Sequence, residues 1–191
     1  MNESLPKENC DNPAPWQHPN GSLYVACGRE IKGNLINLWR AEAITGPWTF
    51  VTGLNNSFST PTPRGKKEDV FIYTDRKGSW HALWHAFFLD EGHRGSCVNS
   101  TVSMHTFSED GHTWHAGAEQ PYTTQVQTTT GVVTVSTRER PKLFFDEAGQ
   151  MTHLVNGVSG AAQCEAGGPP SACTNCKLRS WDYTLVAPLD V

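Results

Sequence analysis

Three stretches of the chain place polar and apolar residues in the same order. Each stretch has a polar triplet, a short apolar run, a turn that ends at a glycine, and a second run with alternating or aromatic character. The triplets are Asp11-Asn12-Pro13, Glu68-Asp69-Val70 and Glu139-Arg140-Pro141. Their third residues lie 8 positions before Gly21, Gly78 and Gly149 (21−13, 78−70, 149−141). Two such runs around a glycine turn predict that each stretch opens as a β-hairpin.

The three stretches also close alike. Residues 38–50, 104–114 and, more weakly, 178–186 have the order strand, tight turn, aromatic residue, strand. Four short strands that recur at a near-constant interval are typical of β-propeller blades. We therefore expect an all-β chain with four-stranded antiparallel blades, in units of roughly 12–53, 68–118 and 138–191 of a single domain or fragment, 1–191. Because propellers have about four to eight blades, three units indicate part of a larger ring.

Composition agrees with a turn-rich β protein and excludes some partners. The 191 residues include 17 Gly and 12 Pro, and 37% of them are hydrophobic. The net charge of −4 offers no basic surface for a phosphate backbone, so nucleic acid is not an expected partner. No apolar run has the length of a membrane span.

Cysteines and glycosylation sequons predict a secretory route. The chain has 6 cysteines, an even number. Sequons occur at Asn2, Asn20, Asn55 and Asn99. The pair Cys173 and Cys176 has the spacing of a metal or redox site, but only Cys164 is near, so we favour disulfides, whose connectivity the sequence does not reveal. The first nine residues contain no apolar segment of a signal peptide, so we expect a lost leader or a start inside a longer gene.

Four carboxylates open the three units. In a propeller the first strand of each blade lines the central channel, so we expect Asp11, Glu68, Asp69 and Glu139 to converge there. Cleavage of a glycosidic bond needs two carboxyl groups, one that protonates the leaving oxygen and one that acts as base or nucleophile. The pattern therefore favours carbohydrate chemistry.

These motifs resemble a known family. Glu139-Arg140-Pro141, Glu68-Asp69-Val70-Phe71 with its Asp75–Gly78 turn, and Asn12-Pro13-Ala14-Pro15 with an Asn-Gly hairpin are similar to successive blades of the five-bladed propeller of glycoside hydrolase family 43. The likeness covers residues 12–158. It implies a general acid at Glu139 and, at Asp69, a residue that orients the acid and tunes its pKa. Val70 stands where the family usually has proline, and the blade that would carry the general base has no counterpart. Asp11 is the only carboxylate that could serve as base, and the resemblance does not assign it that role.

The residues around Glu139 leave two interpretations open. Arg138 and Arg140 would lower the pKa of a neighbouring carboxyl group, which opposes the role of an acid. Strand alternation predicts that both point away from Glu139, whereas the alternative is a buried ion pair with a structural role. For substrate binding the candidates are Asn12, Glu68, His85, Arg138, Arg140 and Asn156.

Other features have structural interpretations. We expect Trp48, Trp80 and Trp84 to pack between blades. His81 and His85 are four apart on a strand, but no third ligand is near, so we predict packing or hydrogen bonds and no metal site or cofactor. Residues 108–114 are close to a sialidase Asp-box, a turn-stabilising feature. Residues 122–137 predict a further hairpin, turning at Gly131, or an edge ribbon.

The sequence thus predicts a secreted, disulfide-bearing, glycosylated propeller that acts on or binds a plant or algal type of polysaccharide or glycan. The alternative is a non-catalytic carbohydrate-binding or surface-interaction protein that lacks the general base. The sugar, the linkage, the stereochemical outcome and the oligomeric state stay open.

Overall fold

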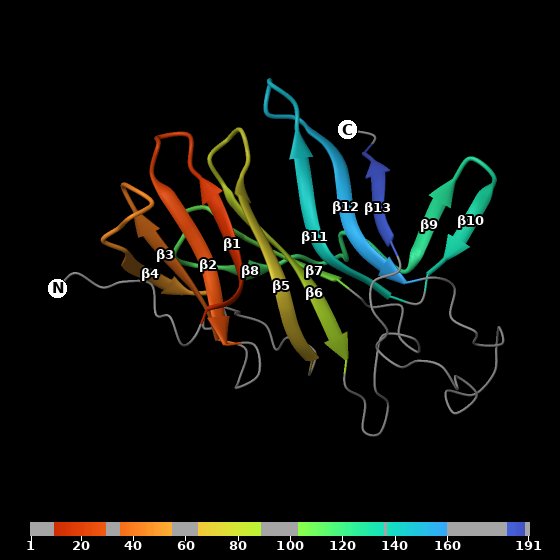
Figure 1. Cartoon of the computed structure of the whole chain (residues 1–191), viewed down its shortest axis with the longest axis horizontal. Coiled ribbons are helices and arrows are strands. Elements are labelled where there is room, and N and C mark those ends of the chain that lie inside the picture. The colour runs from red at the N-terminus through yellow and green to blue at the C-terminus, as the bar shows by residue number, and fades with distance from the viewer. Residues whose placement is uncertain are drawn as a thin grey trace. The chain divides into compact units, whose positions relative to one another are not determined.

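The computed structural model describes residues 10–29, 35–54, 65–88, 103–135, 137–159 and 183–189, and these residues form strands and turns without a helix (Figure 1). The chain divides into two compact units. The first comprises residues 1–62, 67–84 and 105–118, and the second comprises 63–66, 85–104 and 119–191. In the described part no helix is long and apolar enough to span a membrane.

The first four strands form one sheet in the order β1-β2-β3-β4. The strands are β1 (Asp11–Gln17), β2 (Leu23–Arg29), β3 (Leu35–Ala41) and β4 (Thr49–Gly53). Val25, Cys27, Trp39, Ala41 and Trp48 pack together on one face of this sheet. A disulfide joins Cys10 to Cys27, so the expectation of disulfides is confirmed for this pair.

The next four strands form a second sheet in the order β5-β6-β7-β8. They are β5 (Gly65–Thr74), β6 (Trp80–Phe88), β7 (Ser103–Ser108) and the short β8 (His115–Ala116). Trp84 and Trp114 are fully buried. Each has the partner that a buried indole N–H requires, since Trp84 Nε1 donates to Thr106 Oγ1 at 3.0 Å and Trp114 Nε1 donates to the Gly111 carbonyl at 3.2 Å.

Within the first unit, aromatic residues join the two sheets. The Trp80 ring lies 5.5 Å from His18 and 4.6 Å from Tyr24. Trp16 contacts Tyr73 at 6.5 Å, edge to face, and its Nε1 donates to Thr74 Oγ1 at 3.3 Å. The prediction of packing aromatics is confirmed for Trp80, which is 6% exposed.

The second unit holds the remaining strands. β11 (Thr137–Phe145), β12 (Met151–Ser159) and β13 (Tyr183–Pro188) form a three-stranded antiparallel sheet. β9 (Gln125–Thr128) and β10 (Gly131–Thr134) form a separate hairpin, which confirms the predicted extra hairpin. Gly131 pairs with Thr128, so the hairpin turns at residues 129–130 and not at Gly131 itself. The second unit has a hydrophobic cluster of Val126, Val135 and Val158, and Leu185 packs against it.

The three opening hairpins are the same structure. In each, the glycine N–H donates to the carbonyl three residues earlier, from Gly21 to His18, from Gly78 to Asp75 and from Gly149 to Asp146, at 2.8 to 3.0 Å. All three glycines have positive φ, which a type I turn followed by a left-handed residue requires. The hairpins predicted from the sequence are confirmed.

The first strand of each hairpin also carries a left-handed residue that is not glycine. Asn12, Asp69 and Arg140 have φ of 45°, 53° and 54°, and each lies nine residues before its glycine (21−12, 78−69, 149−140). In β1 two residues, 12 and 13, stand opposite Cys27, and in β11 two residues, 140 and 141, stand opposite Asn156. These are β-bulges, and they end the simple alternation of side chains along the strand.

Several sequence predictions fall on residues that the structure does not describe. They concern the sequons at Asn2, Asn55 and Asn99 and the cysteines Cys164, Cys173 and Cys176. The strand proposed near residue 178 also lies there, so three strands of the third blade are described.

Candidate functional site

Glu139 is buried and lies on β11 directly before the bulge. Its side chain is 4% exposed, and its Oε2 lies 3.4 Å from Nδ1 of His85, whose side chain is fully buried. Buried carboxyl groups occur chiefly where they are paired or functional. The imidazole and the carboxyl group are therefore in contact and shielded from water. His85, which the sequence predicted as a substrate contact, lies against Glu139, and a contact with substrate stays a prediction.

Arg138 does not pair with Glu139. Its Nε donates to Asn156 Oδ1 at 2.9 Å and its Nη1 donates to the Thr123 carbonyl at 3.1 Å. Its guanidinium also lies 5.0 Å from the centre of the Tyr122 ring, at the distance of a cation–π contact. Burial lowers the pKa of Arg138, and the Tyr122 phenol acts in the opposite direction. The buried ion pair that the sequence left open does not form between Arg138 and Glu139 in the described part of the chain.

Asn156 connects this arginine to the backbone of Glu139. Its side chain is 0% exposed, and while Oδ1 accepts from Arg138, Nδ2 donates to the Glu139 carbonyl at 3.1 Å. Asn156 stands opposite the bulge, where the strand ladder leaves backbone groups to be satisfied by side chains. Both polar atoms of the Asn156 side chain are thus engaged within the protein, and its predicted contact with sugar stays a prediction.

The other candidates are distributed over both units. Arg140 follows Glu139 in the bulge and is exposed. Asp69, 3% exposed, and Glu68, half-buried, lie on β5 and belong to the first unit. Asn12 is exposed in the bulge of β1, and Asp11 opens that strand with a side chain outside the described residues. The common action of Asp69, Asp11 and Glu139 therefore stays a prediction.

Counted back from the turn glycine of each hairpin, Glu139 corresponds to Glu68 and not to Asp69. Glu139 and Glu68 each stand ten residues before their glycine, whereas Asp69 occupies the bulge position of Arg140 (149−139, 78−68, 78−69). Glu139, the predicted acid, and Asp69, the predicted tuning residue, therefore occupy adjacent positions of the repeated hairpin.

Two histidines of the first unit, His81 and His105, lie within hydrogen-bond distance of each other. Nδ1 of His81 lies 2.9 Å from Nε2 of His105, and Nε2 of His81 lies 3.4 Å from Oδ2 of Asp75. Burial, followed by the nearby His81, lowers the pKa of His105 to about 4. Burial and the Asp75 charge raise the pKa of Tyr73, stacked on His81 at 4.9 Å, to about 12. The prediction of hydrogen bonds for His81 is confirmed.

The Asp-box-like turn is also built as the sequence suggested. Asp110 Oδ1 accepts from the backbone N–H of His112 and of Thr113 at 2.7 Å, and from Ser108 Oγ at 2.9 Å. These hydrogen bonds hold the pKa of the exposed Asp110 far below its ordinary value. The acid stabilises the turn between β7 and β8.

Comparison with known proteins places the fold. No family model and no curated protein matches the sequence. Among solved structures, an exo-β-1,3-galactanase from Clostridium thermocellum is similar over 78% of this chain, with a TM-score of 0.54 and 12% identity. An endo-arabinase from Bacteroides thetaiotaomicron is similar over 97%, with a TM-score of 0.55 and 12% identity. A putative exo-β-1,3-galactanase from Bifidobacterium bifidum is similar over 78%, with a TM-score of 0.51 and 11% identity.

These likenesses define the class of fold. The chain consists of blades of a β-propeller, and the propeller is of the kind found in family 43 glycoside hydrolases. The chain spans 32% and 45% of the two galactanases and 58% of the endo-arabinase. At these identities the likeness concerns the fold, and activity rests on the site.

Proposed function

We propose that this chain is a glycoside hydrolase-like protein that acts on a plant or algal type of polysaccharide, with Glu139 as general acid. The observation that carries the proposal is the buried Glu139 carboxyl group, held by His85 at its oxygen and by Asn156 at its carbonyl. A general acid must keep one geometry while its proton leaves, and a buried carboxyl group in contact with His85, on a backbone bonded to Asn156, meets this demand.

In the proposed reaction the Glu139 proton passes to the glycosidic oxygen while the bond from the anomeric carbon to that oxygen breaks. Water attacks the anomeric carbon and gives its proton to a second carboxylate. The candidate for this base is Asp11, and Asp69 is the proposed partner that tunes the acid. The fold similarity to enzymes named galactanase and endo-arabinase supports galactan and arabinan as the first substrates to examine.

The test compares Glu139→Gln with the wild type on two kinds of substrate. General acid catalysis contributes about 10²–10⁴-fold to rate, so Glu139→Gln should lose that much on polysaccharide. A dinitrophenyl glycoside needs little protonation of its leaving group, so the variant should lose much less on it. Glu147→Gln serves as the control, because Glu147 is an exposed glutamate in the turn of the same hairpin.

Equal losses on both substrates would remove the acid role from Glu139. His85→Gln should lower kcat with little change in KM, because it disturbs the orientation of the acid and not the binding of the sugar. Binding without hydrolysis by the wild type would instead establish the alternative, a non-catalytic carbohydrate-binding protein.

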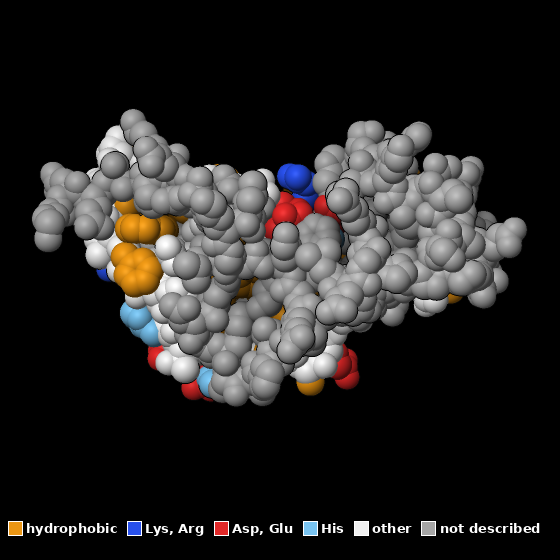
Figure 2. Space-filling model, turned by 90° about the horizontal axis from the view of Figure 1, so that it is seen from below, with side chains coloured by type: hydrophobic (Ala, Val, Ile, Leu, Met, Phe, Trp, Pro, Cys, Tyr) orange, Lys and Arg blue, Asp and Glu red, His pale blue; other side chains and the backbone are white. Residues whose placement is uncertain are grey.

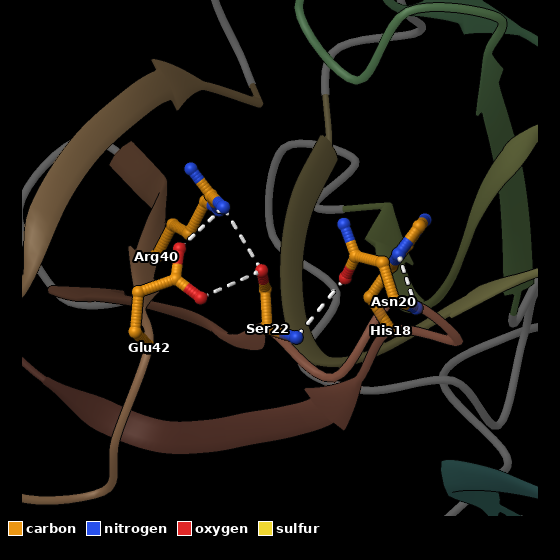
Figure 3. A network of polar contacts seen from close by, with 5 residues as sticks. All are labelled: His18, Asn20, Ser22, Arg40 and Glu42. Carbon is orange, nitrogen blue, oxygen red and sulfur yellow. Dashed lines mark hydrogen bonds and ion pairs between the residues drawn. The ribbon is translucent and has the colours of Figure 1, made fainter.

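We also propose that the protein is secreted and glycosylated at Asn20. Asn20 is exposed at the tip of the β1–β2 hairpin, where its Oδ1 accepts from the Ser22 N–H at 3.0 Å (Figure 3). Its side-chain nitrogen has no hydrogen-bond partner among the described residues, so a glycan there disturbs no contact. Expression in a eukaryotic secretory host should give a glycan that peptide N-glycosidase removes, and Asn20→Gln should abolish that site in the peptide map.

A further inference from the structure

The first unit contains a groove that the proposed reaction does not use. It has a volume of about 450 Å³ and is lined by Tyr24, Arg40, Ala41, Glu42, Pro47, Thr49, Phe50, Val51 and His112. Tyr24, Arg40 and Thr49 are paired neighbours on three adjacent strands, so they form a continuous row across the sheet. The Thr52 hydroxyl donates to the His112 carbonyl at 3.3 Å, which closes one side.

The polar part of the groove is a fixed pair of opposite charges. Arg40 Nη2 contacts both Glu42 Oε1 and Ser22 Oγ, and Ser22 Oγ donates to Glu42 Oε2 at 3.2 Å (Figure 3). Ser22 is 2% exposed, whereas the side chains of Arg40 and Glu42 are 43% and 73% exposed. The buried hydroxyl thus anchors two charged groups whose outer atoms face solvent.

The pair keeps unused hydrogen-bonding capacity. The second terminal nitrogen of Arg40, which points away from Glu42 in Figure 3, has no partner among the described residues. Its Nε is buried and also unpartnered. A guanidinium offers five N–H donors and a carboxylate about four acceptor positions, so the pair presents donors and acceptors side by side.

The exposed aromatic side chain of Phe50 lines this groove. Phe50 is 49% exposed and rests edge to face on Trp39 at 5.7 Å, which fixes the ring without covering it. Hydrophobic side chains are exposed on the face drawn in Figure 2, in the region where Figure 1 shows β3 and β4. An exposed aromatic ring beside fixed polar groups is the usual composition of a specific ligand site.

We propose that this groove binds a neutral sugar unit of a glycan chain, at a place separate from Glu139. Sugar rings have an apolar C–H face that packs on aromatic rings, and neighbouring hydroxyl groups that both donate and accept. A hydroxyl can accept from Arg40 while it donates to Glu42. Because the charges of Arg40 and Glu42 cancel, the groove has no preference for acidic sugars.

The binding experiment uses the full chain carrying Glu139→Gln, so hydrolysis does not interfere. Retention on insoluble galactan, arabinan, xylan and β-1,3-glucan identifies the sugar, and calorimetry with the matching trisaccharide gives Kd. Phe50→Ala should weaken Kd about fivefold to tenfold, in line with the contribution of one aromatic contact. Arg40→Met should weaken it to a similar extent.

Ile44→Ala is the matched control. Ile44 is 80% exposed in the loop between β3 and β4 and does not line the groove, so its truncation should leave Kd unchanged. Retention on none of the four polysaccharides, or equal effects of Phe50→Ala and Ile44→Ala, overturns the proposal, as does capture of a protein in place of sugar. Loss of hydrolysis in Glu139→Gln is read separately, so the groove and the catalytic proposal can fail independently.

Discussion

Substitution of Asn156 tests whether its amide holds Glu139 in place. Asn156→Ala removes the acceptor for Arg138 Nε at 2.9 Å and the donor to the Glu139 carbonyl at 3.1 Å. The site has no exposed surface at Asn156, so water does not replace the lost bonds without rearrangement. A hydrogen bond to a charged group contributes about 1.5–3 kcal/mol and a neutral one about 0.5–1.5 kcal/mol. We expect a loss of about 2 to 4 kcal/mol in the free energy of unfolding.

Asn156→Asp separates the two bonds. The carboxylate still accepts from Arg138, but it places an oxygen where the amide nitrogen donated to the Glu139 carbonyl. This variant should therefore lose less stability than Asn156→Ala while it moves the backbone at Glu139 and lowers kcat. Thr152→Val is the control, because Thr152 on the same strand makes an exposed hydrogen bond to the Phe144 carbonyl of β11 at 3.3 Å.

Urea unfolding followed by circular dichroism measures these changes. With a slope of about 2 kcal/mol per molar urea, the expected loss for Asn156→Ala lowers the midpoint by about 1 to 2 M. Thr152→Val should stay within about 0.5 kcal/mol of the wild type. If Asn156→Ala were as stable as Thr152→Val, the buried amide would not hold β11, and our account of how Glu139 is positioned would be refuted.

Three further predictions follow from the described contacts. His105 has a folded-state pKa of about 4, below its unfolded value, so the free energy of unfolding should fall as pH drops from about 6.5 to 4. The loss should be at most about 2 kcal/mol after solvent screening. His105→Gln should flatten the dependence of the urea midpoint on pH. Asp110→Ala should lower Tm at pH 7 because it removes the acceptor of the turn, and this difference should vanish at low pH, where the lowered pKa of Asp110 is passed. Reduction of the Cys10–Cys27 disulfide, which closes 17 residues, should cost about 3 kcal/mol, as measured by unfolding with and without a reductant.

Much of the fold could be predicted because it is encoded locally. The spacing of triplet and glycine identified three hairpins whose turn hydrogen bonds are the same, since the glycine at a left-handed position is a strong signal. The predicted turn was placed one or two residues too late, because Gly131 was interpreted as its centre. The turn lies at residues 129–130, and Gly131 begins β10. A glycine marks a turn but not always its centre.

The side-chain network around Glu139 could be predicted only in part. Alternation suggested that Arg138 points away from Glu139, and its bonds to Asn156 and Thr123 agree with that. The bulge was not foreseen, because Arg140 gives no sign in sequence of a left-handed conformation. The contact between His85 and Glu139 joins residues 54 positions apart (139−85), and such pairing depends on tertiary packing that no local pattern contains.

The left-handed residue near the start of each hairpin differs in side-chain chemistry from one hairpin to the next. Asn12, Asp69 and Arg140 adopt nearly the same backbone conformation, yet their side chains are an amide, an acid and a base. The backbone accepts any of them, at a cost of about 1 to 3 kcal/mol each for the left-handed conformation. The same backbone position thus carries different side chains in the three hairpins. A duplicated blade can gain, lose or invert a charge there by a single codon change while its strands keep their register.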